Sequence, residues 1–533
     1  MYPIMINYIG SNDSLVFHAS SKEYPLFASS TTSWVPCFED MILILSLVLV
    51  FVFGYFCVLS LSHYVNYRKY LHKYPGPRCY PIIGNTFHFA RGTGLIPSLM
   101  KCKKKYGDIV HCMLPFSQRL FLTGAKPVET LLSSTTLLEK PLIYKFFHPW
   151  LGLGLLTGSG ARWKHIRKLL TPAFHFKILK QFIDIFDKQG NILINILEKC
   201  DGKEVDVFPY IALCSLDIIC EATMNTSVDA QFAPNSEYVS SVHEMCAIVF
   251  RRYHSPLKAW DALYKLSKDY QKQKKALTIL HGYSNAVIKR RKKELEDAKL
   301  HISNKEDEMG NKHRLVFLDL LLLSEVDGKP LPHNVIREEV DTFMFEGHDT
   351  TTSGISFTLY CLSKNPEVQD KVFTELKVID PQGRKAWAYD DLQQMKYLEQ
   401  VIKESLRLYP PVPLFARTPT ENVDFGGTLV PKGISLTVFT YGLHRCPKLY
   451  PNPDVFDPER FTPENSRARS IYGYVPFSTG SRNCIGQRFA MLEIKSIVAY
   501  LIREFKLLEV VGHEPELTVD AILRPQNGLP IRF

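Results

Sequence analysis

One cysteine in a short, glycine-containing loop has the surroundings that metal chemistry requires. The loop reads FSTGSRNCIG from Phe477 to Gly486, and a segment with a helical apolar face, from Gln487 to Glu504, follows it at once. The two glycines allow backbone dihedrals and close approaches that a side chain would block. Cys484 would lie just before a helix N-terminus, where free N–H groups and the helix dipole lower the pKa of a thiol, and Arg482 adds positive charge. We therefore expect a thiolate at Cys484, which is a soft metal ligand with one open side.

The same residues carry a family resemblance. With Phe, Gly, Arg, Cys and Gly at fixed spacing, the loop resembles the haem-binding loop of the cytochromes P450, whereas a free cysteine in a tight turn is the alternative. The resemblance implies that Cys484 is the axial ligand of the iron in haem b. It also implies a cofactor-binding role for the rest of the motif, namely Phe477, Gly480, Arg482 and Gly486.

A long helix is expected from Pro332 to about Lys364, because Pro suits a first helical turn and Asn365-Pro366 suits a stop. Its centre reads FEGHDTTTSG, and the glycine, the acid and three consecutive threonines weaken a helix there. Such weakness is expected where function overrides propensity, although a polar kink packed in the core would read the same. The stretch resembles the oxygen-activation helix of the family. That resemblance implies that Asp349 and Thr350 form the catalytic acid–alcohol pair that relays protons.

Glu346 departs from the commonest family pattern, which has Ala or Gly at this position. The run FEGHDTTTSG closely resembles family four, the microsomal fatty-acid ω-hydroxylase branch. In that branch this glutamate can form an ester with a haem methyl group. A glutamate buried beside an apolar cofactor is otherwise costly, so the resemblance implies an ester-linked haem at Glu346. It also implies ω-hydroxylation of a fatty acid or a related lipid or terpenoid.

Further haem contacts follow from helical spacing and from the resemblance. Trp163 and Arg167 are four residues apart and share one helical face. The resemblance implies that they hold a haem propionate, with Arg417 and Arg482 as further propionate partners. A buried tryptophan beside a solvated arginine is the alternative.

A structural brace is expected around the cysteine loop. Glu404 and Arg407 lie three apart on one predicted helical face, and Arg460 follows in a Pro-Glu-Arg-Phe run. A lone Glu-x-x-Arg is a weak signal, because any solvated helix can carry one. The resemblance implies that these three residues form a triad that braces the loop of Cys484.

An apolar run near the N-terminus predicts a membrane anchor. Residues 41–61 carry no charge, and 21 residues span a bilayer core as a helix. A buried core helix and a cleaved signal peptide are the alternatives. Basic residues follow the run at positions 68, 69, 73 and 78, whereas residues 1–40 carry one lysine against four acids, so the C-terminal part should face the cytosol. We expect a single-pass protein of the endoplasmic reticulum, with residues 1–40 a lumenal tail or an extension ahead of a start at Met41.

Composition favours a large globular body. The chain has 533 residues, of which 46% are hydrophobic, and a net charge of +10 that suits a membrane surface or an acidic protein partner. No nucleic-acid motif occurs, and the 12 cysteines form no Cys-x-x-Cys pair, which argues against structural zinc and fits a reducing compartment. We expect a basic, proline-rich linker over 62–80 and one domain over 81–533.

The predicted fold class is mostly α with small β-sheets, and the resemblance implies the single-domain helical prism of the family. Hairpins are expected at 108–116 with 118–123, and at 521–523 with 529–531 across Asn527-Gly528. Further strand signals occur over 423–441. Helices are expected over 237–252 and 268–295, and a charged surface loop over 295–313. The aromatic run from Tyr144 to Leu151 could line an apolar substrate channel or pack as a loop on the core.

The resemblance implies a monooxygenase that takes electrons from NADPH through a reductase, with cytochrome b5 as a second candidate donor. The acidic surface of the reductase would meet Lys164, Lys168 and Lys495. Two alternatives stay open: a haem-thiolate isomerase or dehydrase that does not use dioxygen, and a non-catalytic, membrane-anchored haem-binding protein. Asp349 and Thr350 argue against the isomerase, because that chemistry needs no proton relay.

Overall fold

The structure is a computed structural model that describes residues 38–533, except 82, 90–91, 115–116, 234–235, 303–315, 327 and 384–385. The predicted tail over 1–40 thus lies almost wholly outside the described residues. The described chain divides into two units, one ending at Phe56 and one beginning at Cys57. Helix α1 (Phe38–Tyr70) spans this division, and together with the 3-10 turn Leu71–Lys73 it forms a helical segment, Glu39–Lys73, that is long and apolar enough to cross a membrane. The expected linker is therefore helical over its first half, because the apolar run continues into a helix-compatible basic stretch.

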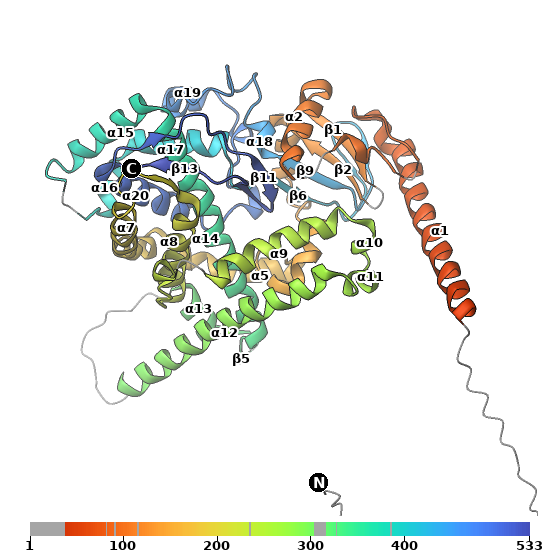
Figure 1. The fold of residues 1–533 in the computed structure, drawn as a ribbon, viewed down its shortest axis with the longest axis horizontal. Helices are drawn as coiled ribbons and strands as arrows, with labels where there is room; N and C mark the ends of the chain where they lie inside the picture. The colour runs from red at the N-terminus through yellow and green to blue at the C-terminus, as the bar shows by residue number, and fades with distance from the viewer. Residues whose placement is uncertain are drawn as a thin grey trace, which may run out of the picture. The chain divides into compact units, whose positions relative to one another are not determined.

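One long helix runs through the larger unit, and other helices pack around it (Figure 1). The long helix is α14 (His333–Lys364), which confirms the prediction from Pro332 and Asn365. It packs against α8 (Val207–Met224), α17 (Lys396–Leu408), α20 (Gln487–Glu504) and α12 (Lys268–Ile302). Helix α20 has the predicted bounds and also packs on α7 (Ile183–Glu198). Nearly all of α14 is buried, so its side chains define both the core and the cavities beside it.

Helix α8 is as apolar as a membrane span, yet it is mostly buried within the protein. Two acids interrupt it, Asp217 and Glu221. Glu221 forms an ion pair with Lys188 at 2.8 Å, and the carboxylate of Asp217 accepts hydrogen bonds from the backbone N–H groups of Ala230 (2.6 Å) and Gln231 (2.9 Å). Burial is therefore accompanied by hydrogen bonds to the charged group, as a buried carboxylate requires.

A four-stranded sheet has the order β1-β2-β9-β6. The predicted hairpin is confirmed as β1 (Ile109–Leu114) and β2 (Ser117–Leu122), which pair antiparallel. Strand β9 (Ser435–Phe439) lies parallel to β2, and β6 (Leu414–Arg417) pairs antiparallel with β9. Helix α2 (Leu95–Tyr106) packs beside this sheet.

Two local predictions are wrong. The Asn527-Gly528 turn does not close a hairpin, because β12 (Ile522–Pro525) pairs with β11 (Leu517–Asp520), and β13 (Pro530–Arg532) pairs with β10 (Leu508–Glu509) and β3 (Glu204–Asp206). The turn instead carries the chain from one sheet to another. The surface loop predicted over 295–313 is helical as far as Ile302, where α12 ends, because most charged residues tolerate a helix well, and residues 303–313 lie outside the described residues.

The other elements complete the body. Helix α9 (Glu237–Tyr253) runs beside α12, as the two predicted helices suggested. Further described helices are α3 (Ala125–Leu132), α4 (His148–Leu151), α5 (Gly160–Leu170), α6 (Phe176–Leu179), α10 (Pro256–Ala259), α11 (Asp261–Lys265), α13 (Phe317–Leu323), α15 (Pro366–Ile379), α16 (Tyr389–Gln394), α18 (Thr440–Leu443) and α19 (Pro463–Arg467). Short strand pairs are β4 (Glu325–Val326) with β5 (Lys329–Pro330), and β7 (Val423–Asp424) with β8 (Leu429–Val430).

Candidate functional site

A cavity of about 240 Å³ lies between α14, α5 and the loop that precedes α20. Its lining includes most of the residues singled out from the sequence: Trp163, Arg167, Glu346, Thr350, Arg417, Phe477, Arg482, Cys484 and Gly486. Of the predicted catalytic and cofactor-binding residues, Gly480 and Asp349 do not line it. The structure thus assembles these residues into one site from four separate parts of the sequence.

The cysteine loop is shaped by its backbone. The N–H of Cys484 donates to the carbonyl of Phe477 at 2.9 Å, which closes the loop. Gly480 has a φ of +74°, and a Cβ there would lie 2.1 Å from the carbonyl oxygen of Leu132. Only glycine allows both the positive φ and the close approach to the Leu132 carbonyl. Gly480 therefore packs the loop against the end of α3 and does not line the cavity.

The expectation of a lowered thiol pKa is wrong for the protein alone. Burial among protein atoms raises the pKa of Cys484 to about 12, and nearby Glu346 adds to the rise. The backbone N–H of Gly486 and the charge of Arg167, not that of Arg482, act in the opposite direction. The thiol reaches the cavity surface, so a metal ion bound there could replace its proton.

Four cations line the same cavity: Lys140, Arg167, Arg417 and Arg482. None of them forms an ion pair with a carboxylate of a described residue. Burial, then the neighbouring Arg417, lowers the pKa of Arg482 to about 10, and burial with the same arginines lowers the pKa of Lys140. The cations therefore repel one another, and the cavity would be stabilised by a group that carries negative charge. No motif in the sequence singles out Lys140.

The arginines are held in position by the backbone. Arg482 donates to the carbonyls of Leu138 (2.7 Å) and Gly158 (2.7 Å), and its guanidinium lies 4.4 Å from the ring centroid of Trp163. Arg167 donates to the carbonyl oxygen (2.9 Å) and the side-chain oxygen (2.8 Å) of Asn483. Trp163 and Arg167 are therefore both tied to the cysteine loop. The cavity therefore has cations without a carboxylate partner among the described residues, and a sulfur atom at its surface. These groups fit a cofactor whose carboxylates would pair with the cations and whose metal ion would bind the sulfur.

Among the described residues, Glu346 is the one acid in the cavity lining. Burial raises its pKa to about 7, although Lys140, Arg482 and Arg167 pull it down. Thr350 lies one turn further along α14, and its hydroxyl donates to the backbone carbonyl of Glu346 at 2.7 Å. Both side chains thus occupy the face of α14 that borders the cavity.

Asp349 is turned away from this face. Its carboxylate forms an ion pair with Arg524 of β12. Burial opposes its ionisation, but Arg524, with His348 and His243 beside it, keeps its pKa below the usual value. The predicted acid–alcohol pair is therefore not assembled in the cavity: Thr350 lines it and Asp349 does not. Consecutive helical residues point about 100° apart, so both cannot face one direction.

A second cavity, of about 150 Å³, adjoins the first. The two cavities share lining residues that include Tyr144, Leu156, Glu346, Thr350 and Phe415. Phe147 also lines the second cavity, whereas Trp150 and Leu151 are buried in the core. The aromatic run therefore lines the cavity with Tyr144 and Phe147 and packs in the core with Trp150 and Leu151.

The predicted brace is formed. Arg407 contacts Glu404 through Nε (2.6 Å) and a second nitrogen (2.8 Å), and Nε of Arg460 lies 3.4 Å from the same carboxylate. Arg407 also donates to the carbonyl of His444 at 2.9 Å, and Nε2 of His444 accepts from the N–H of Val475 at 3.0 Å. Sequence reasoning missed His444, which joins the triad to the chain just before the cysteine loop.

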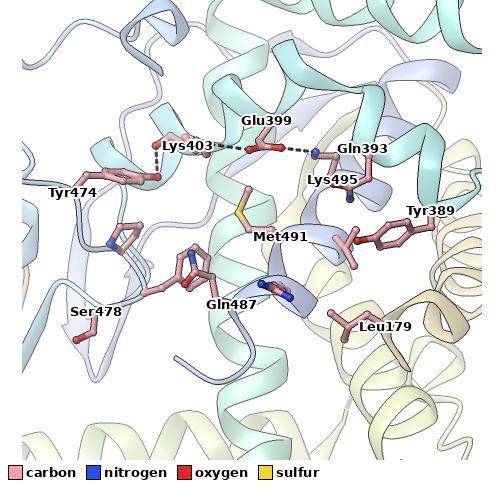
Figure 2. A pocket seen from close by; sticks show the side chains of 14 residues that line it. Leu179, Tyr389, Gln393, Glu399, Lys403, Tyr474, Ser478, Gln487, Met491 and Lys495 are labelled. Atoms are coloured by element: carbon pink, nitrogen blue, oxygen red, sulfur yellow. Dashed lines mark hydrogen bonds and ion pairs between the residues drawn. The ribbon is translucent and has the colours of Figure 1, made fainter. Parts of the chain in front are cut away.

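A surface pocket of about 460 Å³ borders the loop, and it shares Phe477 and Ser478 with the first cavity. Figure 2 shows that Lys495 points inward to Glu399, at 2.9 Å, with Lys403 on the other side of that carboxylate at 2.8 Å. Lys495 is buried, so its assignment to an exposed basic face is wrong. Lys164 and Lys168 are exposed as expected, and the exposed Arg488 lines the pocket.

Comparisons with known proteins agree with this architecture. A family model described as Cytochrome P450 matches residues 74–533. The chain is 42% identical over 482 residues to human Cytochrome P450 4V2, covering 87% of this chain and 91% of the relative, and 46% identical over 463 residues to the mouse protein, covering 86% and 88%. Cytochrome P450 4c3 of Drosophila melanogaster is 40% identical over 480 residues, covering 87% and 90%. The chain therefore belongs to the cytochrome P450 family, and it is a haem-dependent monooxygenase that resembles family four.

Proposed function

We propose that this monooxygenase hydroxylates a long-chain fatty acid or a related lipid at or near its ω end. The observation that carries the proposal is the pair of adjoining cavities, one bordered by Cys484 and the other mainly apolar, with Thr350 and Glu346 on the wall of both. A long apolar chain in the second cavity would present one end to the first. Terminal C–H bonds are strong, so attack there depends on positioning.

In this proposal the chain's own residues hold the cofactor and exclude water. Cys484 would ligate the iron of haem b, while Arg167, Lys140, Arg417 and Arg482 would bind its two carboxylates. When bound, haem supplies the activation of dioxygen. Because the hydroxyl of Thr350 already lines the cavity, it is the proton donor or water-binding group on the substrate side. Asp349 is paired with Arg524 and does not line the cavity, so it would act as a positioning residue rather than beside Thr350.

Glu346 would hold haem through an ester to one of its methyl groups, as the resemblance to family four implies. The two hydrogens lost would be taken up by dioxygen with NADPH, which would leave as two molecules of water and NADP+. Its position on the wall of the cavity and the cost of burying its charge support this assignment. Acid denaturation followed by reversed-phase chromatography tests it. Part of the haem absorbance should stay with the wild-type polypeptide after turnover, and all of it should elute free from Glu346→Ala. Free haem from both proteins would contradict the ester.

Electrons would come from NADPH through a reductase, with cytochrome b5 as an alternative donor. An acidic partner surface would meet the cysteine loop where Arg488 lines the surface pocket, and Lys164 and Lys168 add exposed charge. Helix α1 would anchor the protein in the endoplasmic reticulum with its body in the cytosol. The basic flank after residue 61 supports that orientation.

Reconstitution tests the activity directly. The full-length protein, a reductase and NADPH should convert dodecanoic acid mainly to its ω-hydroxy product, identified by mass spectrometry. Omission of NADPH should abolish product, whereas a haem-thiolate isomerase or dehydrase would not need it. Oxidation of neutral terpenoids but not of acids would overturn the substrate assignment and leave the monooxygenase standing.

A further inference from the structure

An arginine without a carboxylate partner lies in the apolar cavity. Arg119 of β2 lines the second cavity but not the cavity that contains Cys484. Its Nε is buried and has no hydrogen-bond partner, and a terminal nitrogen lies 3.5 Å from the hydroxyl of Ser117. Within the described chain, Arg119 forms no ion pair. A guanidinium keeps its charge at all ordinary pH values, so this cation is buried without a counter-ion.

The sheet explains how the cation reaches the cavity. Alternate residues of a strand share one face, and Arg119 with Phe121 on β2, and Ser435 with Thr437 on β9, all line the cavity. Arg119 pairs in register with Ser435. The hydroxyls of Ser435 and Thr437 lie 3.1 Å apart. This wall therefore combines one charge with hydroxyl groups, in a chamber that is otherwise mainly aromatic and aliphatic.

The aromatic neighbours keep the cation in place. The guanidinium of Arg119 lies 4.9 Å from the ring centroid of Tyr253 and 5.7 Å from that of Phe121. The hydroxyl of Tyr253 is 2.9 Å from that of Ser117. Cation–π contacts offset part of the desolvation cost, but they leave the planar N–H groups without an anionic acceptor.

We propose that Arg119 binds the carboxylate of the substrate and so selects an ionised acid over a neutral lipid. The guanidinium fits a carboxylate through two parallel hydrogen bonds. Arg119 lines only the second cavity, while Thr350 lines both, so an acid bound at Arg119 extends its chain from the carboxylate towards Thr350 and Cys484. This inference rests on the proposed function. It deepens that function by making Arg119 a specificity-determining residue that sets which end of the substrate is oxidised.

Binding measurements without turnover test the proposal. Equilibrium dialysis of the full-length holoprotein with labelled dodecanoic acid, methyl dodecanoate and 1-dodecanol gives three dissociation constants. The acid should bind the wild type more tightly than either neutral analogue. Arg119→Gln should weaken binding of the acid by about tenfold to a hundredfold, the range expected for a lost charge-assisted hydrogen-bond pair, and change the neutral analogues by less than about threefold. Arg119→Lys should recover part of the affinity for the acid. Arg467→Gln, which removes an exposed arginine of α19, is the matched control and should change none of the three.

The wild-type series keeps the proposal falsifiable even if Arg119→Gln does not fold. Equal affinity of the wild type for the acid and its methyl ester would overturn it. So would an equal loss for acid and alcohol in Arg119→Gln, because that result assigns Arg119 a packing role. In either case continued hydroxylation of the same chain would leave the proposed function intact. Failure of all three compounds to bind the wild type would instead refute the proposed function.

Discussion

Replacement of Arg407 by methionine should strongly destabilise the protein. Arg407 and Glu404 are both fully buried, and the arginine makes two contacts with the carboxylate. It also donates to the carbonyls of His444 (2.9 Å), Pro453 (2.6 Å) and Val455 (3.1 Å). Methionine keeps much of the volume but none of these donors. Glu404 would retain only the N–H of Asp457 and the more distant Arg460.

The size of the effect follows from the burial of the pair. Removing one partner of a buried ion pair costs about 3–5 kcal/mol, because the other charge is left without compensation. A domain is stable by only about 5–15 kcal/mol, so Arg407→Met should remove a large share of the free energy of unfolding. Because Arg407 reaches the chain before the cysteine loop through His444, the variant should also retain less haem on purification.

Denaturant unfolding of the full-length protein in detergent, followed by tryptophan fluorescence, measures the change. Arg290→Met is the matched control: Arg290 and Glu294 form a solvent-exposed pair at 3.2 Å on α12, worth less than about 1 kcal/mol. The double variant Glu404→Gln with Arg407→Met should be more stable than Arg407→Met alone, since it buries no unpaired charge. If Arg407→Met and Arg290→Met lose the same small amount, the brace does not stabilise the fold.

Three shorter predictions concern the site and its surroundings. Cys484→Ala should abolish the long-wavelength Soret band of the reduced carbon-monoxide complex, and a retained band would remove Cys484 as the ligand. Thr350→Ala should lower the product formed per NADPH by about tenfold or more and release peroxide, because positioned proton transfer contributes about 10²–10⁴-fold. Thr350→Ser keeps the hydroxyl and should restore coupling. If coupling is unchanged in Thr350→Ala, the role of Thr350 is structural only. Burial raises the pKa of Glu493 to about 8, so the folded protein holds a proton that the unfolded chain releases near pH 4.3. The stabilisation from this proton is fully present below about pH 4.3 and is lost as the pH rises towards 8. The free energy of unfolding should fall by at most about 1.4 kcal/mol per pH unit in this window. Glu493→Gln, measured by unfolding at several pH values, should lose less stability over this window than the wild type, and parallel curves would contradict the assignment.

Local signals predicted the local structure well. The bounds of α20 and of α14 follow from sequence because Pro332, Asn365 and the loop glycines act within one turn of the helix ends. The resemblance placed the cysteine loop and the Glu404–Arg407 pair for the same reason, because the loop is contiguous and the pair lies on one helical face. Arg460 comes from a separate segment, and only the order of the motifs pointed to it.

The predictions that were wrong concern contacts between residues that lie far apart in the sequence. Asp349 pairs with Arg524, which lies 175 residues later, and no local pattern indicates that contact. No sequence pattern distinguishes Lys140 or Arg119 from ordinary surface cations, and only tertiary packing brings them to the cavities. Lys495 was expected at the surface, but Glu399 of another helix pairs with it in the interior. The Asn527-Gly528 turn was recognised, whereas the partner of the strand after it was not.

Helix α8 has a consequence for the biogenesis of the protein. A chain whose first apolar segment enters a membrane is synthesised beside that membrane, where α8 meets the same insertion machinery with a second apolar segment. Its main packing partner, α14, begins roughly a hundred residues later, a delay on the order of ten seconds at about 5–20 residues per second. Asp217 lies near the middle of α8, and an acid at the centre of a span adds about 2.5–3.5 kcal/mol to the cost of insertion. In the folded protein Asp217 accepts a hydrogen bond from the N–H of Ala230, and during synthesis the same carboxylate would oppose insertion of α8 into lipid until α14 is made.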